Sequence, residues 1–355
     1  MIITYARSSS IGTISFCEMK YFCVYNLGFK DKENVKAMMG TVIHRVLQVL
    51  ADKKLAQEQK LGRVINDDIP NLSYKKCDDI PYVTKLCFDY YKSHSTIADK
   101  LGPRELNTCI DWVNRAITYN AGDLDPRNQN VYATELFFDI EIKKPWAKYE
   151  YTIGDEKLSG FFSIKGTVDL ILQEDDRYYH ILDYKSGRRY DWGTDTVKTP
   201  EKLQKDTQLL LYYYALRNMY PDKEFFVSIY YINDYKIDGQ MVKGGLYSMV
   251  FDDEDYEKAE NILRQKFEYI RSVELPRQLD PRHNHFKCKY LCEFSKPWQN
   301  SEESTCNFMH RMIQSQGIEK TIAEYGDVKT IGTYKDGGGV IYKPEEDDKC
   351  TIKTV

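Results

Sequence analysis

The sequence lacks any long hydrophobic run. No stretch approaches the roughly 18 consecutive apolar residues that a membrane-spanning helix needs, and the mean hydropathy is −0.58. It also lacks an excess of one charge, because 50 Lys and Arg residues stand against 54 Asp and Glu residues, for a formal net charge of −4. A globally basic nucleic-acid-coating protein is therefore excluded, and any nucleic-acid surface must be a local cluster of cations. The first residues do not follow the charged-then-apolar order of a secretory signal, so we expect a cytoplasmic protein with no membrane partner.

The chain is long enough for about two domains, since its 355 residues compare with roughly 100 to 200 residues in a typical domain. Its composition, 42% hydrophobic and 29% charged residues, is that of ordinary folded domains and excludes both global disorder and a fibrous repeat. Nine cysteines are present. In a reducing compartment an odd number of thiols, several of them near the C-terminus, favours a metal or cluster site over disulfide bonds.

Hydrophobic periodicity predicts an α/β (α+β) fold with a mixed central sheet flanked by helices. Apolar residues recur every three or four positions in some segments, as in amphipathic helices, and alternate among β-branched and aromatic residues in others, as in strands. Helices are expected at 35–54, 83–91, 106–118, 201–219 and 255–272, and strands at 133–142, 161–172, 178–184, 225–232 and 246–251. The polar stretch 173–177 predicts a hairpin between the two strands that flank it. This order of strands and helices is that of a layered domain.

Changes of composition along the chain indicate five segments. They are an N-terminal segment with a cysteine and a histidine-bearing helix (1–54), a helical insertion (55–130), the core (131–275), a cysteine-rich segment (276–312) and a C-terminal extension (313–355). The extension contains a glycine triplet at 337–339. Because the triplet lacks the Lys-Ser/Thr of a phosphate-binding loop, we interpret it as a turn.

Two carboxylates and a lysine form the most informative pattern. Asp169 ends the motif Gly166-Thr167-Val168-Asp169 in one expected strand, and Asp183 lies fourteen residues later, near the end of the next. A hairpin can bring both to one edge of the sheet, where carboxylate oxygens suit Mg²⁺ or Mn²⁺. Lys185 follows Asp183 by two residues and so lies on the same strand face. Its ammonium can orient an attacking water and stabilise negative charge that develops on a phosphate.

An Asp followed a hairpin's length later by Asp-x-Lys resembles the PD-(D/E)xK nuclease superfamily, which has a restriction-endonuclease-like core. The first motif has Gly-x-x-Asp in place of Pro-Asp, and in this it resembles the first motif of the RecB-like branch. That branch includes the iron-sulfur-cluster exonucleases related to CRISPR spacer-acquisition nucleases and AddAB-type nuclease domains. That branch carries a histidine on an early helix, matched by His44 at the end of Gly40-Thr41-Val42-Ile43-His44. It also carries a Gln-x-x-x-Tyr motif, matched by Gln208 and Tyr212, which share one helical face and would orient the lysine or the nucleic-acid backbone.

The resemblance implies a metal site. His44, Asp169 and Asp183 would hold the ion, and Lys185 would position the attacking water. Glu135 matches a further glutamate on the strand before Gly-x-x-Asp; the alternative for Glu135 is a solvated strand charge. Taken singly, each of these residues has an ordinary structural alternative, and their common order along the chain favours the nuclease interpretation.

The cysteines show a second resemblance, to the RecB-like nucleases that close their domain with a [4Fe-4S] cluster held by one N-terminal and three C-terminal cysteines. The matching residues are Cys17, Cys288, Cys292 and Cys306. Their spacing is Cys-x-x-x-Cys and then thirteen intervening residues, whereas the family commonly has Cys-x-x-Cys and a shorter gap. A structural Zn²⁺ bound by the three C-terminal cysteines and His283 or His285 is an alternative. Cys23 is a rival for Cys17 as the N-terminal ligand.

Cations follow the Asp-x-Lys motif closely in the sequence. The candidates for binding DNA are Arg188, Arg189, Lys202 and Lys205. Such a stripe can track phosphates and would make binding dependent on salt. No residue type in it indicates base recognition, so we expect little sequence specificity.

Together these patterns predict a metal-dependent DNA nuclease. We expect an exonuclease on single-stranded DNA or duplex ends that serves recombination, repair or phage DNA metabolism in the cytoplasm of a prokaryote or a phage-infected host. A helicase, a recombinase or another DNA-processing protein would be its partner. The alternative is a non-catalytic DNA-binding or scaffold module of a recombination or repair complex, and an RNA substrate is compatible with the same motifs.

Overall fold

The structure is a computed structural model that describes residues 1–64, 68–191, 196–237, 239–328 and 331. The chain forms two compact units, each assembled from distant stretches of sequence. The first unit comprises residues 1–32, 138–166 and 253–338, and the second comprises residues 33–137, 167–252 and 339–355. Within the part of the chain that is described, no helix is long and apolar enough to cross a membrane.

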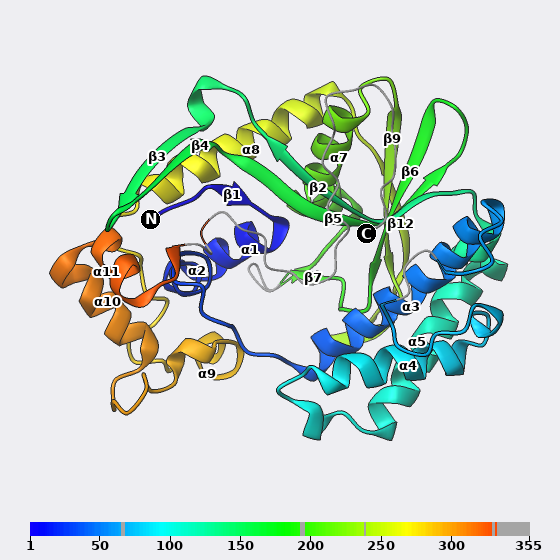
Figure 1. Ribbon diagram of the computed structural model, residues 1–355, viewed down its shortest axis with the longest axis horizontal. Coiled ribbons are helices and arrows are strands. Elements are labelled where there is room, and N and C mark those ends of the chain that lie inside the picture. Colours follow the sequence, from blue (N-terminus) through cyan, green and yellow to red (C-terminus); the bar gives the residue numbers. More distant parts are fainter. Residues whose placement is uncertain (65–67, 192–195, 238, 329–330, 332–355) are drawn as a thin grey trace. The chain divides into compact units, whose positions relative to one another are not determined.

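The second unit is built on a mixed sheet (Figure 1). Strands β5 (Ser163–Gln173), β6 (Tyr178–Lys185), β9 (Glu224–Tyr231) and β12 (Gly245–Val250) follow one another in that spatial order, and β2 (Val131–Glu141) pairs with β5. β5 and β6 are antiparallel, which confirms the expected hairpin, while β6 and β9 are parallel and β9 and β12 antiparallel.

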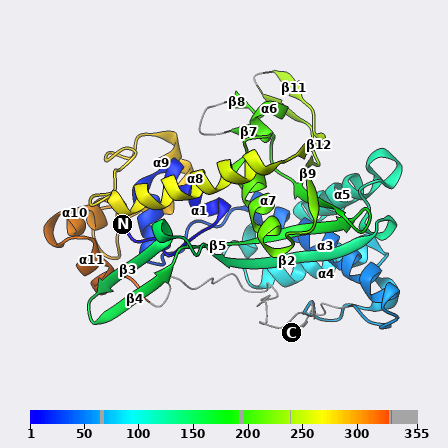
Figure 2. The same ribbon diagram turned by 90° about the horizontal axis from the view of Figure 1, so that it is seen from above.

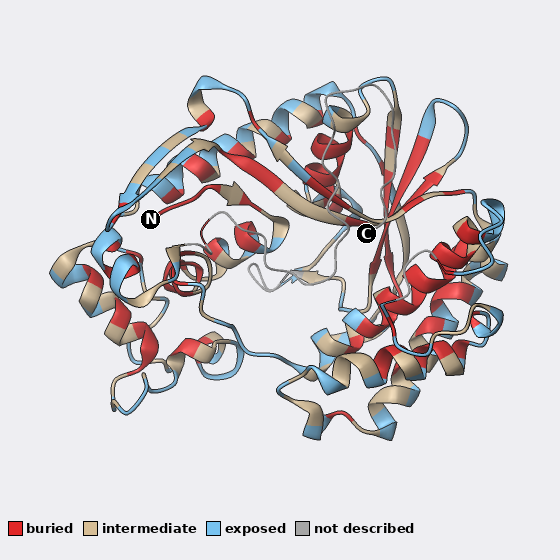
Figure 3. Ribbon diagram, in the orientation of Figure 1, coloured by how far each residue is buried: buried red, intermediate tan, exposed pale blue. Residues whose placement is uncertain are grey.

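Three helices cover one face of this sheet: α3 (Val35–Glu58), α4 (Ile80–Ser93) and α5 (Pro103–Thr118). Their apolar stripes join Leu170, Leu182 and Tyr230 of the sheet in one buried cluster. Figure 3 shows the corresponding buried stretches in red along α3 and the central strands. The Asn34 side chain starts α3 by accepting a hydrogen bond from the backbone N–H of Ala37, which satisfies one of the free amides of the first turn.

Helix α7 (Thr207–Met219) packs on β9 and covers the opposite face of the sheet. Its Gln208 side chain donates a hydrogen bond to Asp183. Asp183 follows Leu182 along β6 and so points away from the face on which Leu182 packs against the other three helices. The prediction of a single helix over 201–219 was wrong. Helix α6 (Pro200–Leu203) ends early, and Asp206 adopts an extended conformation whose carboxylate accepts a hydrogen bond from the backbone N–H of Gln208. This cap starts a new helix. Helices on both faces of a mixed sheet confirm the predicted fold class.

Smaller elements complete the second unit. They are the hairpins β7 (Tyr190–Asp191)/β8 (Thr196–Val197) and β10 (Tyr235–Ile237)/β11 (Gln240–Val242), and the short helical turns Tyr74–Lys76, Ala98–Lys100, Tyr119–Gly122 and Pro126–Asn128. The strand and helix bounds differ from the expected ones by a few residues at most sites, since α3 runs to Glu58 and α4 starts at Ile80.

The first unit combines segments from both ends of the chain. β1 (Tyr5–Ala6) pairs in parallel with Ser163–Ile164 of β5, and β3 (Lys148–Ile153) forms an antiparallel hairpin with β4 (Glu156–Phe161) that is also visible in Figure 2. Its helices are α1 (Ser8–Phe16), α2 (Glu18–Tyr21), the π-helix Phe22–Asn26, α8 (Asp253–Ser272), α9 (Phe286–Leu291), α10 (Thr305–Gln316) and α11 (Ile318–Tyr325), with short turns at Pro145–Ala147 and Glu293–Ser295. The glycine triplet at 337–339 lies outside the described residues.

Candidate active site

The site forms where β5 and β6 separate. The pairing of these strands runs from Gln173 with Tyr179 to Leu170 with Leu182. One residue further along β5, a side chain makes the contact between the two strands. The Oδ2 atom of Asp169 accepts a hydrogen bond of 3.0 Å from the backbone N–H of Tyr184. The carboxylate of Asp169 is therefore held by the neighbouring strand at the end of the ladder.

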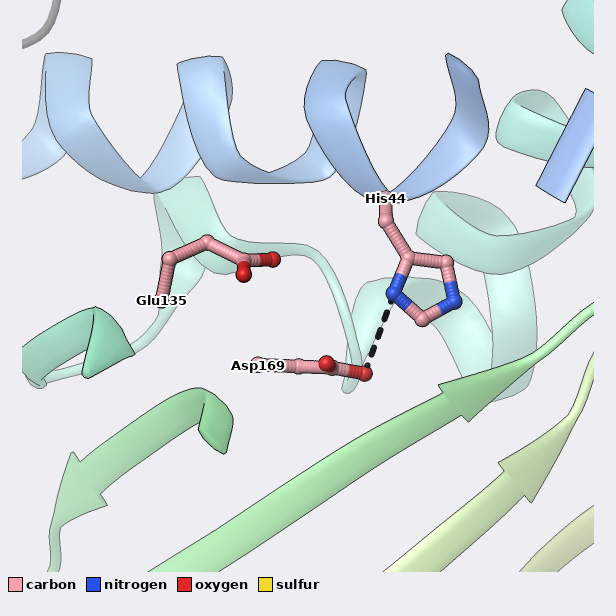
Figure 4. Close-up of side chains that lie close together, drawn as sticks. All are labelled: His44, Glu135 and Asp169. Carbon is pink, nitrogen blue, oxygen red and sulfur yellow. Dashed lines mark ion pairs between the residues drawn. The ribbon is translucent and has the colours of Figure 1, made fainter. Parts of the chain in front are cut away.

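His44 and Glu135 converge on Asp169 (Figure 4). The Nδ1 atom of His44, on α3, lies 3.2 Å from Oδ2 of Asp169. One ligand atom from each of the three residues lies within 4.8 Å of the other two. They line a small pocket, partly open to solvent, together with Gln48 and Tyr184 among others. Three residues from a helix and two strands thus present an imidazole and two carboxylates to one small space.

Glu135 reaches the pocket through an unusual backbone conformation. Its φ angle is 45°, in the left-handed region that non-glycine residues rarely occupy and that costs about 1–3 kcal/mol. Such strain persists only where the surrounding structure enforces it. In β2 the conformation belongs to the residue whose carboxylate lies close to Asp169 and His44.

A second hydrogen-bonded group surrounds Asp183, which is fully buried. Its Oδ2 lies 2.7 Å from the ammonium of Lys185, and its Oδ1 accepts hydrogen bonds from Gln208 Nε2 at 2.9 Å and from the Tyr212 hydroxyl at 3.4 Å. Gln208 also donates to the Tyr212 hydroxyl at 2.6 Å. One carboxylate of β6 is thus fixed by its own strand and by the first turns of α7.

The two groups are coupled electrostatically. Burial and the charge of Asp169 raise the pKa of Glu135 to about 8. Burial also raises the pKa of Asp183 to about 6, with Lys185 opposing and Asp169 adding to the rise. Burial opposes ionisation of Asp169 too, but the charge and hydrogen bond of His44 outweigh it and lower the pKa of Asp169. The carboxylates of Glu135, Asp169 and Asp183 are therefore close enough to influence one another's ionisation.

The positive charge in the site comes from His44 and Lys185. Burial lowers the pKa of His44, but Asp169 raises it by more, to about 9. Burial likewise opposes the charge of Lys185, and the carboxylates of Asp183 and Asp169 raise its pKa above the ordinary value. The residues fit a divalent cation, because clustered carboxylates are the ligand type that binds Mg²⁺ or Mn²⁺ and a cation would relieve their mutual repulsion.

The expected DNA-binding cations lie after β6 and on α6. The guanidinium of Arg188 lies 5.2 Å from the ring centroid of Tyr235, and that of Arg189 lies 4.7 Å from the ring centroid of Tyr247. Such contacts hold the arginine planes in place. Lys202 donates to the Thr196 hydroxyl, and Lys205 is exposed at the end of α6.

The four cysteines predicted as cluster ligands line one pocket of the first unit. It measures about 330 Å³, is partly open to solvent, and also contacts His283. Cys17 joins α1 to α2, Cys288 and Cys292 lie on and directly after α9, and Cys306 begins α10. Burial raises the pKa of Cys292 to about 11 and that of Cys306 to about 12, and neighbouring thiols add to the rise. Metal binding at Cys292 and Cys306 would have to displace the protons that these raised pKa values retain.

The other candidates for that pocket differ in position. His283 donates or accepts a hydrogen bond of 2.7 Å with the Ser304 hydroxyl, whereas His285 caps α9 by accepting from the backbone N–H of Lys287. Cys23 is fully buried in the π-helix, and the nearby Cys306, Cys292 and Cys17 add to burial in raising its pKa. Over the described residues, the one set of three potential ligands within 4.8 Å of one another is His44, Glu135 and Asp169.

Gln48 lines the active-site pocket but was not predicted from the sequence. It lies one helical turn after His44 on α3, is 8% exposed, and accepts a hydrogen bond from Arg45. The signal was its spacing, since residues four apart on a helix share a face.

Comparison with protein families assigns the chain to a superfamily. Residues 8–296 match the PD-(D/E)XK nuclease superfamily. The chain belongs to this superfamily of nucleases, and so to the phosphodiester hydrolases. No curated protein matches the chain.

Two solved structures are similar to the chain at low identity. A protein from Eubacterium rectale described as a "Putative exonuclease" is 10% identical, with a TM-score of 0.38 over 83% of this chain and 91% of that one. The protein SSO0001 is 12% identical, with a TM-score of 0.20 over 61% of this chain and 72% of that one.

Proposed function

We propose that the protein is a metal-dependent deoxyribonuclease of the RecB-like branch, an exonuclease on single-stranded DNA or duplex ends. The observation that carries the proposal is the hydrogen-bonded group of Asp183, Lys185, Gln208 and Tyr212 beside the group of His44, Glu135 and Asp169. A half-buried lysine beside the fully buried carboxylate of Asp183 is costly to fold. Such an arrangement is expected at functional sites.

In this proposal His44, Asp169 and Asp183 hold Mg²⁺ or Mn²⁺, and Glu135 is a further ligand. When bound, the ion supplies Lewis-acid stabilisation of the phosphate. Asp169 is suited to the role because Tyr184 N–H already fixes one of its oxygens. The strained backbone of Glu135 aims its carboxylate at the same space.

Lys185 would position the attacking water and stabilise charge on the phosphate. Its ammonium lies 2.7 Å from Oδ2 of Asp183 and has a raised pKa. The ammonium therefore remains charged, and the ion pair with Asp183 fixes its orientation. Gln208 and Tyr212 act as positioning residues, because both donate to Asp183 Oδ1 and so fix the carboxylate that orients the lysine. A preorganised ammonium of this kind costs no reorganisation during the reaction.

We also propose that Cys17, Cys288, Cys292 and Cys306 hold a [4Fe-4S] cluster. Four thiolates are the usual ligands of such a cluster, and all four line one pocket. Zinc bound at about 2.3 Å to each sulfur needs ligand atoms roughly 3.8 Å apart. Since no three ligand atoms of that pocket lie within 4.8 Å of one another among the described residues, the wider cluster is favoured over structural Zn²⁺.

DNA is the proposed substrate, and Arg188, Arg189, Lys202 and Lys205 would contact its phosphates. The two arginines are held over tyrosine rings, and the two lysines lie on or beside α6, just ahead of the helix that carries Gln208. A role in recombination, repair or phage DNA metabolism with a helicase or recombinase follows from the resemblance alone.

The test is cleavage of end-labelled single-stranded DNA with Mn²⁺, Mg²⁺ or chelator. We expect metal-dependent degradation by the wild type, and loss of about 10³-fold or more in rate for Asp183→Asn and Lys185→Ala. Asp176→Asn is the matched control, because Asp176 is an exposed carboxylate in the β5–β6 turn. Unchanged cleavage by Asp183→Asn would overturn the assignment. A wild-type protein that binds DNA without cleaving it would support the alternative of a non-catalytic scaffold.

A further inference from the structure

The first unit exposes an unusual set of side chains on α9. Phe286 is 47% exposed, Tyr290 is 70% exposed and Leu291 is 44% exposed. Scattered exposed apolar residues need no explanation, but a contiguous group marks an interaction site. We call Phe286, Lys287, Lys289, Tyr290 and Leu291 the α9 patch. In Figure 3 the ribbon of α9 and its flanking loops is largely pale blue and tan.

The two aromatic rings of the α9 patch lie on one side of the helix. Phe286 and Tyr290 are four residues apart, so they share a helical face and are separated by about 6 Å along the axis. The ring of His285 stacks on that of Phe286, with centroids 4.9 Å apart. Flat rings presented in sequence are the surface on which unpaired bases stack.

Cations lie close to these rings in the sequence. Lys287 and Lys289 belong to the α9 patch, and Arg282 precedes it in the loop. In the part of the chain that the structure describes, none of these three side chains forms an ion pair. The ammonium of Lys287 lies 5.1 Å from the ring centroid of Phe16, which also has Lys20 at 4.8 Å.

Over the described residues, the nearby carboxylates form no ion pair with these cations. Asp280 accepts hydrogen bonds from the backbone N–H groups of Arg282 and His285. Asp31 pairs with Lys20, and Glu293 pairs with Lys296. The positive charge of the α9 patch is therefore left for a partner, and that partner must be both negatively charged and able to stack.

We propose that the α9 patch binds single-stranded DNA, with bases stacked on Phe286 and Tyr290 and phosphates near Lys287 and Lys289. Single-stranded DNA meets both requirements, whereas the bases of a duplex are already stacked on each other. The proposal rests on the proposed function for its choice of DNA. It adds a binding surface in the first unit that is separate from the carboxylate group of the second.

The test measures binding without cleavage. Full-length Asp183→Asn protein is titrated onto a fluorescent thymidine oligonucleotide, and anisotropy is read over a range of salt concentrations. Stacking contributes about 1–3 kcal/mol per base, or about 5- to 150-fold in affinity. We expect Phe286→Leu/Tyr290→Leu, which keeps apolar bulk and removes the rings, to weaken binding by at least about tenfold with an unchanged salt slope.

The lysines have a different signature. Lys287→Gln/Lys289→Gln should lower the slope of log affinity against log salt by about 1.4, since each cation on a single strand contributes about 0.7. Phe286→Tyr keeps a ring and should bind as the parent protein does. Tyr178→Leu is the matched control, because Tyr178 is an aromatic residue of the second unit that is 39% exposed.

Circular dichroism checks that each variant is folded. Affinity that is unchanged by Phe286→Leu/Tyr290→Leu would overturn the proposal, as would an equal loss in Tyr178→Leu. If the parent protein self-associates and the double variant is monomeric with unchanged DNA affinity, the α9 patch is a contact between copies of the chain and the proposal is wrong. Because binding is read directly, a protein with no nuclease activity can still support or overturn it.

Discussion

Replacing Glu135 by Gln should stabilise the metal-free protein. Glu135 has an ordinary pKa of 4.5 and a folded pKa of about 8, raised by burial and by Asp169. At pH 7 the unfolded chain has released this proton while the folded chain retains it, and the difference costs the fold about 3 kcal/mol. Because Glu135 lines a pocket that is partly open to solvent, we expect a gain of about 1–3 kcal/mol from the neutral amide.

The stability difference between the wild type and Glu135→Gln should depend on pH, with a sign set by the direction of the pKa shift of Glu135. Since the folded pKa lies above the unfolded one, stability from this group is fully present below pH 4.5 and is lost as pH rises toward about 8. The advantage of Glu135→Gln should therefore be near zero at pH 4.5 and largest at pH 8 and above. Thermal unfolding in chelator at a series of pH values measures it, at roughly 2–4 °C per kcal/mol.

Bound metal should reverse the order of stability of the wild type and Glu135→Gln. At the proposed site Mn²⁺ would bind the folded state through the carboxylates, so it should raise the unfolding midpoint of the wild type by more than that of Glu135→Gln. Glu141→Gln is the control, because Glu141 is an exposed carboxylate of the same strand. The reasoning would be refuted if Glu135→Gln were the less stable protein in chelator at pH 8, or if its advantage did not change with pH.

Three further predictions concern other parts of the fold. Burial lowers the pKa of His180 to about 4, so stability should fall as pH drops from 6.5 toward 4, and urea denaturation of His180→Gln should show a weaker fall. Asp206→Ala should cost about 1 kcal/mol by removing the cap of α7, and in the proposed enzyme it should lower kcat more than it raises KM, because Gln208 in the first turn of α7 holds Asp183. Gly166→Ala should destabilise by about 1–3 kcal/mol, since its Cβ would lie 2.5 Å from the Phe138 ring; Gly187→Ala, with no atom within 4 Å, should not.

Much of the fold was predictable from sequence periodicity. The strands that carry Asp169 and Asp183 are rich in apolar, β-branched and aromatic residues, and the polar stretch between them predicts a hairpin. The break before α7 was missed because apolar residues continue with helical spacing through 201–219, and only the Asp206 cap separates the two helices. The β3–β4 hairpin was also missed, since its strands are largely exposed and carry a weak apolar signal.

The candidate site was predictable in its residues but not in its geometry. His44 and Asp169 lie 125 residues apart in sequence and 3.2 Å apart in space, and motif order alone could place them together. The positive φ angle of Glu135 and the hydrogen bond from the backbone of Tyr184 to Asp169 depend on how β2 and β6 pass each side of β5. Tertiary structure sets such details, and local sequence does not encode them.

The thiol pocket of the first unit has a consequence for synthesis. Its walls come from both ends of the chain, and Cys306 leaves the ribosome 289 residues after Cys17. At roughly 5–20 residues per second, translation takes about 15–60 s to cover that distance. During this interval the whole second unit up to residue 252 can fold while the N-terminal helices wait for their partners. Insertion of any metal into the pocket is therefore confined to the time after translation of α10, and a truncated chain that ends before α10 could complete its sheet but not this site.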